Sequence, residues 1–474
     1  MREKDIKELR TQEIIAYGVA GFGQNIIYAL SFYFLNNFYT DAFGLTAAAA
    51  GTLMLVAKFW DAVMDPIMGT IVDRTRSRWG KLRPFLLFAP IPLAVFTILT
   101  FSAPQLNDTM KLVYAYVTYL LWGTIYSACD VPYWGLSAAM TADTQKRAKL
   151  ISFTRILTML GIASVYVLMP QILPLFSGMG YSPEAIQGAT PELQAAMNRQ
   201  GYFWVAIILT VVGCVLLTLA FFKTRERATQ NAERPKLMET LKLVGKNKPL
   251  LLLLLSGLLG ATMNTVGFAG IYFAKYNLGD EGALTLLAAL NLGGMVVAMA
   301  LLPLLTKRFS KRNIYIAGNI FGAVVSFAFY FIGYSSGILN AVAYVLIGLS
   351  SGIFTVLQTA LIGDTVDYLQ WKTGKRAEGI CFAGQTFITK VTAGLSNAAV
   401  MWVLAATAFQ ANAQATPAVK DGIFMTITLL PAIGCALSII PLFFYKFTEK
   451  QQKMAVEEIN AREGSMPESV EHAL

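Results

Sequence analysis

Charge is scarce in this chain: Asp, Glu, Lys and Arg supply 14% of its 474 residues, against about a quarter in a soluble domain. The single histidine, His472, lies near the end of the sequence. A histidine-based proton relay or metal site in an apolar segment is therefore excluded. Cysteine is also rare, and the four cysteines lie in apolar runs without CxxC spacing, which predicts small core residues rather than disulfides or metal ligands. They are Cys129, Cys214, Cys381 and Cys435.

Hydrophobic residues make up 55% of the chain, and the mean hydropathy is +0.54. A helix that spans a bilayer needs about 20 mostly apolar residues, and the sequence contains twelve segments of this kind. We therefore expect an all-α membrane protein in contact with the lipid bilayer. The predicted spans are residues 14–38, 46–72, 84–103, 111–140, 150–176, 201–222, 250–276, 283–306, 313–334, 338–366, 378–409 and 421–446.

The basic residues indicate how the spans are oriented. They gather in the N-terminal segment, in every second loop and in the tail, whereas the alternate loops hold only Lys111, Arg199, Lys275 and Lys420. By the positive-inside rule, both termini are expected to be cytoplasmic. The net charge of +10 is spread over these loops rather than gathered on one face, so nucleic acid is not an expected partner. The first residues contain no short apolar core, and we expect no cleaved signal peptide.

A long polar loop divides the twelve spans into two sets of six. A faint internal repeat agrees with this division, because FLNNFYTD near the end of the first span resembles YFAKYNLGD near the end of the seventh. Weak symmetry between halves is typical of transporters built from two repeats. The predicted parts are an N-terminal six-helix bundle (1–222), a cytoplasmic middle loop (223–249), a C-terminal six-helix bundle (250–447) and a cytoplasmic tail (448–474).

The second span carries three charges in the stretch KFWDAVMDP: Lys58, Asp61 and Asp65. At about 100° per residue, they fall within roughly 60° of one another on a helix. Such charges at membrane depth are costly unless they meet partners, water or an ion, and they usually mark an ion or proton pathway. The alternative is an internal salt bridge that only positions this helix.

Three further charges, Asp130, Arg155 and Lys390, lie within predicted spans. With three acidic and three basic residues in all, the interior is balanced, which favours a neutral ligand that arrives with a cation. Alternatives remain for individual residues: Trp134 suits packing, Arg155 an ion pair, and Lys390 the neutralisation of Asp61 or Asp65. Polar and aromatic groups near these charges suit the binding of sugar hydroxyls and sugar rings. They are Asn25, Tyr126, Ser127, Trp134, Gln385 and Thr386.

Several motifs resemble a known family. They are FYTD, WDAVMDPIMG, RSRWGKLRP, CDVPYWGL, FTR, DTVDY and GQTFITK, and they extend over nearly the whole chain. The sequence is similar to the glycoside–pentoside–hexuronide:cation symporters, the branch of the major facilitator superfamily that includes the melibiose permease. The resemblance implies a twelve-helix transporter of the bacterial inner membrane that couples a sugar to H⁺, Na⁺ or Li⁺ and needs no cofactor.

The resemblance also implies site residues. The coupling-cation site would comprise Asp61, Asp65 and Ser127. The sugar site would comprise Asp130, Trp134 and Arg155, with Lys390 between the two sites.

Two departures from the family pattern bear on specificity. Asn25 stands where the permease has a sugar-binding aspartate, so a charge-assisted contact is lost and melibiose does not carry over as the substrate. Met64 stands where the permease has an asparagine, and a thioether is a poor partner for a hard cation such as Na⁺. These residues favour H⁺ slightly over Na⁺ and a neutral glycoside or pentoside as the sugar.

Two other functions compete with symport at this stage. A membrane-embedded enzyme acting on lipid-linked sugars would use paired aspartates, but the chain contains no phosphate-cradling glycine loop and no metal-ligand cluster with histidine. No catalytic residue is therefore expected. A membrane sensor that binds a sugar without transporting it stays open, because it would need the same binding residues.

Overall fold

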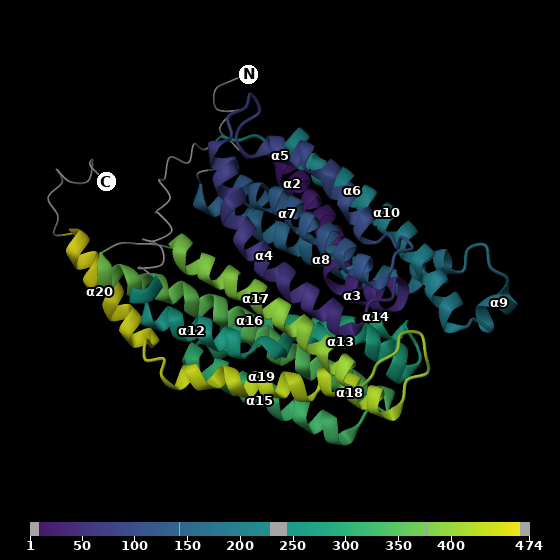
Figure 1. The fold of residues 1–474 in the computed structure, drawn as a ribbon. Helices are drawn as coiled ribbons and strands as arrows, with labels where there is room; N and C mark the ends of the chain where they lie inside the picture. Colours follow the sequence, from purple (N-terminus) through teal and green to yellow (C-terminus); the bar gives the residue numbers. More distant parts are fainter. Residues whose placement is uncertain (1–8, 142, 228–243, 375–377, 465–474) are drawn as a thin grey trace. The chain divides into compact units, whose positions relative to one another are not determined.

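The computed structural model describes residues 9–141, 143–227, 244–374 and 378–464, and within these ranges every regular element is a helix (Figure 1). The elements of the first half are α2 (Thr11–Ala29), η1 (Leu30–Phe34), α3 (Leu35–Asn37), η2 (Phe38–Phe43), α4 (Ala47–Arg74), α5 (Arg83–Phe88), α6 (Pro90–Thr100), α7 (Asp108–Met140), α8 (Thr144–Ser177), α9 (Pro183–Gln187) and α10 (Pro191–Lys223). Those of the second half are α12 (Lys248–Leu259), η3 (Ala261–Asn264), α13 (Thr265–Tyr272), η4 (Phe273–Leu278), α14 (Ala283–Leu305), α15 (Lys311–Ile332), α16 (Gly337–Thr373), α17 (Glu378–Ala406), α18 (Pro417–Ile427), α19 (Leu429–Phe443) and α20 (Glu449–Gly464).

Each predicted span coincides with helix in the described residues. Ten helices are long and apolar enough to cross a membrane, and α12 with the helices up to Leu278 forms an eleventh candidate that bends by 51°. The third predicted span is divided into α5 and the apolar α6. Pro90 begins α6, and a proline ends a helix because it lacks the N–H that would continue the hydrogen-bond ladder.

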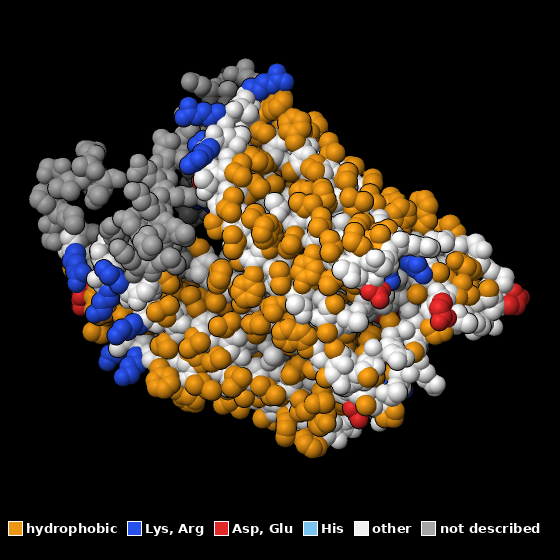
Figure 2. Space-filling model, viewed as in Figure 1, with side chains coloured by type: hydrophobic (Ala, Val, Ile, Leu, Met, Phe, Trp, Pro, Cys, Tyr) orange, Lys and Arg blue, Asp and Glu red, His pale blue; other side chains and the backbone are white. Residues whose placement is uncertain are grey.

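Hydrophobic side chains cover much of the visible surface of the described residues (Figure 2). Large apolar residues such as Phe331 and Ile338 are 71% and 78% exposed. An exposed apolar surface of this extent is not stable in water, and lipid is its natural solvent. The four cysteines are all buried, as predicted for core residues.

The first compact unit comprises residues 1–232, 267–286 and 397–423. In it α2 packs against both α8 and α10, and α4 packs against α7. Small residues bring α2 and α10 together, since a Cβ on Gly23 would lie 2.6 Å from the carbonyl oxygen of Gly213. The Tyr17 hydroxyl donates to the Tyr133 carbonyl at 2.8 Å, and the Tyr133 hydroxyl donates to the Tyr17 carbonyl at 2.9 Å.

A carboxylate organises the loop between α4 and α5. The side chain of Glu226 accepts hydrogen bonds from the backbone N–H groups of residues 81–83 at 2.8 to 3.0 Å. Gly80, which precedes them, has a φ of +106°, and a Cβ there would lie 2.4 Å from this carboxylate. Nearby in sequence, Arg227 pairs with Glu13 at 2.8 Å. These contacts join the start of α2, the loop before α5 and the segment that follows α10.

The second compact unit comprises residues 233–266, 287–396 and 424–474. Here α15 packs against α16 and α19, and α12 packs against α19. Lys311 pairs with Asp364 at 2.6 Å. In the tail, α20 packs against α16 with Ala455 and Ile459 buried.

The internal repeat seen in the sequence is also present in the backbone. The segments η2 and η4 are both π-helices of six residues. Each is followed by a glycine in the left-handed conformation, Gly44 with φ of 81° and Gly279 with φ of 72°. The first and seventh predicted spans therefore end in the same way, with a six-residue π-helix followed by a left-handed glycine.

Candidate functional site

Lys58 and Asp61 form an ion pair within α4. The Lys58 Nζ lies 2.9 Å from an Asp61 carboxylate oxygen, and the two residues are only 5% and 8% exposed. Their spacing of three residues places them on one face of the helix, as the sequence predicted. The structure therefore contains a salt bridge between these two residues, and the participation of Asp61 in a cation site stays a prediction.

The surroundings of this pair are shaped to hold both charges. The Lys58 ammonium lies 5.0 Å from the ring centroid of Phe32 and 5.9 Å from that of Tyr28, within cation–π range. On the other side, a Cβ on Gly123 would lie 2.3 Å from an Asp61 oxygen. The absence of a side chain at Gly123 thus makes the space that the Asp61 carboxylate occupies.

Asp65 of α4 contacts the neighbouring helix α7. Its carboxylate accepts a hydrogen bond from the Ser127 hydroxyl on α7 at 2.8 Å. A carboxylate and a hydroxyl together provide hard oxygen atoms of the kind that alkali cations and protons bind. Met64 precedes Asp65 and supplies no oxygen ligand.

A second polar cluster is centred on Asp130 of α7. One carboxylate oxygen accepts from the Gln24 amide at 2.8 Å and from the Trp134 indole N–H at 3.1 Å. The Arg155 guanidinium of α8 lies 4.2 Å from the Trp134 ring centroid. Asp130, Trp134 and Arg155, which the sequence grouped by resemblance, thus lie together in the first unit.

Gln24 is a member of this cluster that the sequence analysis missed. A carboxylate only accepts hydrogen bonds, so the amide nitrogen must face Asp130 and the amide oxygen must face away. That oxygen is buried and has no hydrogen-bond partner. The signal in the sequence was a pair of adjacent amides, Gln24 and Asn25, in an apolar part of the first span, and nothing in the sequence distinguished the two.

The other two predicted sugar-site residues of the first unit are Asn25 and Tyr126. The amide nitrogen of Asn25 donates to the carbonyl of Gly21 in its own helix at 2.9 Å. The ring of Tyr126 stacks on Trp122 at 5.1 Å between centroids and lies 5.6 Å from the Tyr28 ring. Their contact with a sugar stays a prediction.

The remaining predicted residues, Gln385, Thr386 and Lys390, belong to α17 in the second unit. The Gln385 amide donates to the Thr359 hydroxyl at 2.8 Å, and the Thr386 hydroxyl donates to the Phe382 carbonyl at 3.1 Å. Their participation in the same binding site as Asp130 stays a prediction.

Comparison with known proteins relates the whole chain to sugar transporters. A family described as MFS/sugar transport protein matches residues 16–449. The glucuronide carrier protein homolog of Escherichia coli (strain K12) is 31% identical over 460 residues, which cover 96% of this chain and 97% of the relative. The isoprimeverose transporter of Lactiplantibacillus pentosus is 30% identical over 462 residues, which cover 96% of this chain and 93% of the relative.

A similar fold occurs in a bacterial homolog to the human lysosomal transporter Spinster, solved in an inward-facing and occupied conformation. The TM-score is 0.65, and the match covers 93% of this chain and 97% of that chain. At 13% sequence identity, this likeness concerns the fold alone.

Proposed function

This chain belongs to the MFS/sugar transport family, and on that premise we propose that it is a secondary symporter. It couples the uptake of a neutral sugar, a glycoside or a pentoside, to a cation by alternating access. H⁺ is the proposed coupling cation, and Na⁺ is the alternative. The proposed cation site is Asp61, Asp65 and Ser127, and the proposed sugar site includes Asp130, Trp134, Arg155 and Lys390.

The Asp130 cluster is the observation that best supports a sugar as substrate. An ionised carboxylate accepts hydroxyl hydrogens, a guanidinium donates to hydroxyl oxygens, and an indole face packs on the apolar side of a sugar ring. The unpartnered amide oxygen of Gln24 adds a buried acceptor. A buried acceptor without a partner costs about 1–3 kcal/mol, and a sugar hydroxyl would recover part of this.

The contacts in α4 support H⁺ over Na⁺. Lys58 already neutralises Asp61 at 2.9 Å, so a metal cation would have to displace a tethered ammonium. Asp65 has the Ser127 hydroxyl beside it at 2.8 Å, and Met64 supplies no hard ligand. A proton needs one carboxylate oxygen rather than a shell of several oxygen ligands.

The proposal is tested by uptake into membrane vesicles of a panel of glycosides, pentosides and hexuronides, each with an imposed H⁺ or Na⁺ gradient. We expect gradient-driven accumulation of at least one sugar. Asp65→Asn should abolish accumulation but retain exchange of labelled sugar (counterflow), because it removes the coupling carboxylate and leaves the sugar cluster. Asp130→Asn should abolish both, because the negative acceptor at the centre of the sugar cluster is lost.

Asp108→Asn is the matched control, because Asp108 lies on the same helix as Asp130 and its side chain is 99% exposed. It should behave as the unchanged protein does. Binding without counterflow or accumulation would identify a sensor rather than a transporter. Undiminished accumulation in Asp65→Asn would refute the assignment of the cation site.

A further inference from the structure

The first unit contains an ion pair at the ends of the first and seventh spans. Asp41 lies in η2 and is 0% exposed. Its carboxylate accepts from the Lys275 ammonium, from the Tyr276 hydroxyl at 2.7 Å and from the neighbouring Thr40 hydroxyl at 2.7 Å. Removing one partner of a buried pair is strongly destabilising, because it leaves a charge without compensation.

The two π-helical ends bring these groups together. Asp41 is the fourth residue of η2, and Tyr276 is the fourth residue of η4. The fourth residues of the two π-helical ends are therefore in direct hydrogen-bond contact. Short π-helical turns are rare and occur frequently at functional sites, and here both of them meet in one contact.

A third segment closes this contact. Asn412, between α17 and α18, has a φ of +58°, which asparagine tolerates better than most residues. Its side chain donates to the Asp41 carbonyl at 2.6 Å and accepts from Lys275 at 3.1 Å. Its backbone N–H donates to the Tyr276 hydroxyl at 3.0 Å. Segments far apart in the sequence are thus held around one buried carboxylate.

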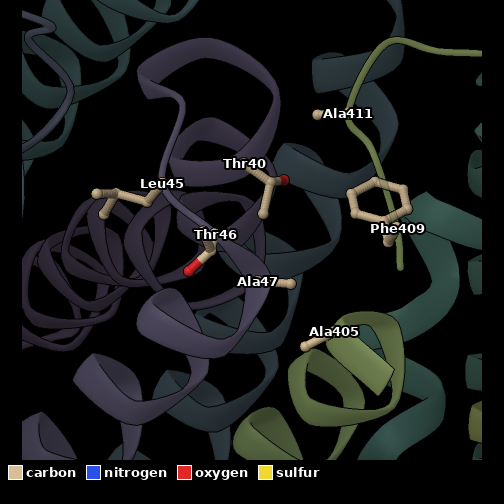
Figure 3. Close-up of a pocket in the computed structure, with 7 residues that line it drawn as sticks. All are labelled: Thr40, Leu45, Thr46, Ala47, Ala405, Phe409 and Ala411. Carbon is tan, nitrogen blue, oxygen red and sulfur yellow. The ribbon is translucent and has the colours of Figure 1, made fainter. Parts of the chain in front are cut away.

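A cavity of about 230 Å³ lies beside this network (Figure 3). Ala47, at the start of α4, lines the cavity and is 6% exposed, whereas its neighbour Thr46 is exposed. The cavity has room for a sulfur atom at position 47. The lining residues are Thr40, Leu45, Thr46, Ala47, Ala405, Phe409 and Ala411.

We propose that Asp41 and Lys275 form a lock that holds the ends of the first and seventh spans together and must open in each transport cycle. The positive-inside rule places this end outside the cell, since Lys275 is one of few basic residues in the loops there. Alternating access requires these ends to separate when sugar enters from outside. This inference rests on the proposed function, but its central test does not require transport.

The test measures how fast a membrane-impermeant maleimide, added from outside, labels the single substitution Ala47→Cys. The four native cysteines are buried, and the chain without Ala47→Cys supplies the background. The lock is broken with Lys275→Met, which leaves the buried Asp41 carboxylate without its ammonium. The pair Asp41→Asn and Lys275→Met removes both charges and serves as the comparison. Lys275→Arg keeps the ion pair and is the conservative variant.

Lys275→Met should speed labelling of Ala47→Cys by at least about tenfold, because the Asp41 carboxylate without its ammonium is destabilised while buried and becomes hydrated when these ends separate. The double variant has no buried charge left, so it should label more slowly than Lys275→Met. Lys275→Arg should label at nearly the original rate. Thr46→Cys, already exposed, should label at the same rate in every background, which controls for reagent access. The thermal unfolding midpoint of each variant verifies that it is folded.

An unchanged labelling rate in the folded Lys275→Met variant would overturn the lock. Faster labelling with no change in the KM or kcat of sugar uptake would contradict its opening in each cycle. If no sugar is transported under any gradient, the proposed function fails, but the labelling rates still decide whether the pair holds these ends together.

Discussion

Neutralising Lys58 or Asp61 alone should destabilise the protein, whereas neutralising both together should not. Lys58→Met leaves the Asp61 carboxylate buried without its ammonium, and Asp61→Asn leaves the Lys58 ammonium without its carboxylate. Each single substitution should lower the free energy of unfolding by about 3–5 kcal/mol. The double substitution removes both charges, and it should leave stability nearly unchanged or increase it.

The expected size follows from the geometry of the pair. Two unit charges 2.9 Å apart attract by about 6 kcal/mol at an effective dielectric constant of about 20. In the intact pair this attraction offsets the cost of removing both charges from water. In a double-mutant cycle, the sum of the two single losses in unfolding free energy should therefore exceed the loss in the double variant by about 6 kcal/mol.

The assay uses the four buried cysteines as reporters. Unfolding exposes them to a thiol-reactive fluorophore, and equilibrium unfolding in mixed micelles gives the free energy of each variant. The control pair is Lys111 and Asp108, which has the same three-residue spacing at 3.6 Å, but with Asp108 99% exposed. Neutralising either member of this exposed pair should change stability very little.

Two results would refute this reasoning. Single variants as stable as the unchanged protein would show that water or another group compensates the remaining charge. A double variant as unstable as the weaker single variant would show that packing of the side chains, rather than their charges, stabilises this part of α4.

Two glycines and one carboxylate allow further tests. Gly123→Ala should destabilise the protein in the same unfolding assay, because the new Cβ would lie 2.3 Å from an Asp61 oxygen; unchanged stability would show that Asp61 has other space. Gly80→Ala should also destabilise it, because φ is +106° and the Cβ would lie 2.4 Å from the Glu226 carboxylate; an unaffected unfolding curve would contradict this. Glu226→Ala removes the acceptor of three backbone N–H groups, so amide hydrogen exchange of residues 81–83 should become faster, and unaltered exchange would show that this carboxylate does not hold the loop.

Sequence alone predicted the membrane fold and the family. Both predictions are confirmed by the helices of the described residues and by the match to the MFS/sugar transport family. The similarity to bacterial transporters agrees with the predicted location in the inner membrane. These features follow from local composition, since a bilayer requires about 20 apolar residues in every span and places most basic residues on one side.

Prediction from sequence was less complete at the site. The pairing of Lys58 with Asp61 could be predicted, because their three-residue spacing places them on one helix face. The binding of Asp130 by Gln24 could not, because it joins residues 106 positions apart. Asn25 and Gln24 carry nearly the same chemical group, and only packing of α2 decides which of them faces Asp130.

The sequence by itself thus determined the apolar, helical nature of the spans, the family and the stripe of charges in the second span, because each depends on composition or spacing within one segment. Only the tertiary structure decided the roles of Gly123, Gln24 and Asp41. Gly123 makes the space for the Asp61 carboxylate, and Asp41 meets Lys275 across 234 positions of the chain. Contacts of this kind depend on how helices pack, and no spacing along one helix encodes them.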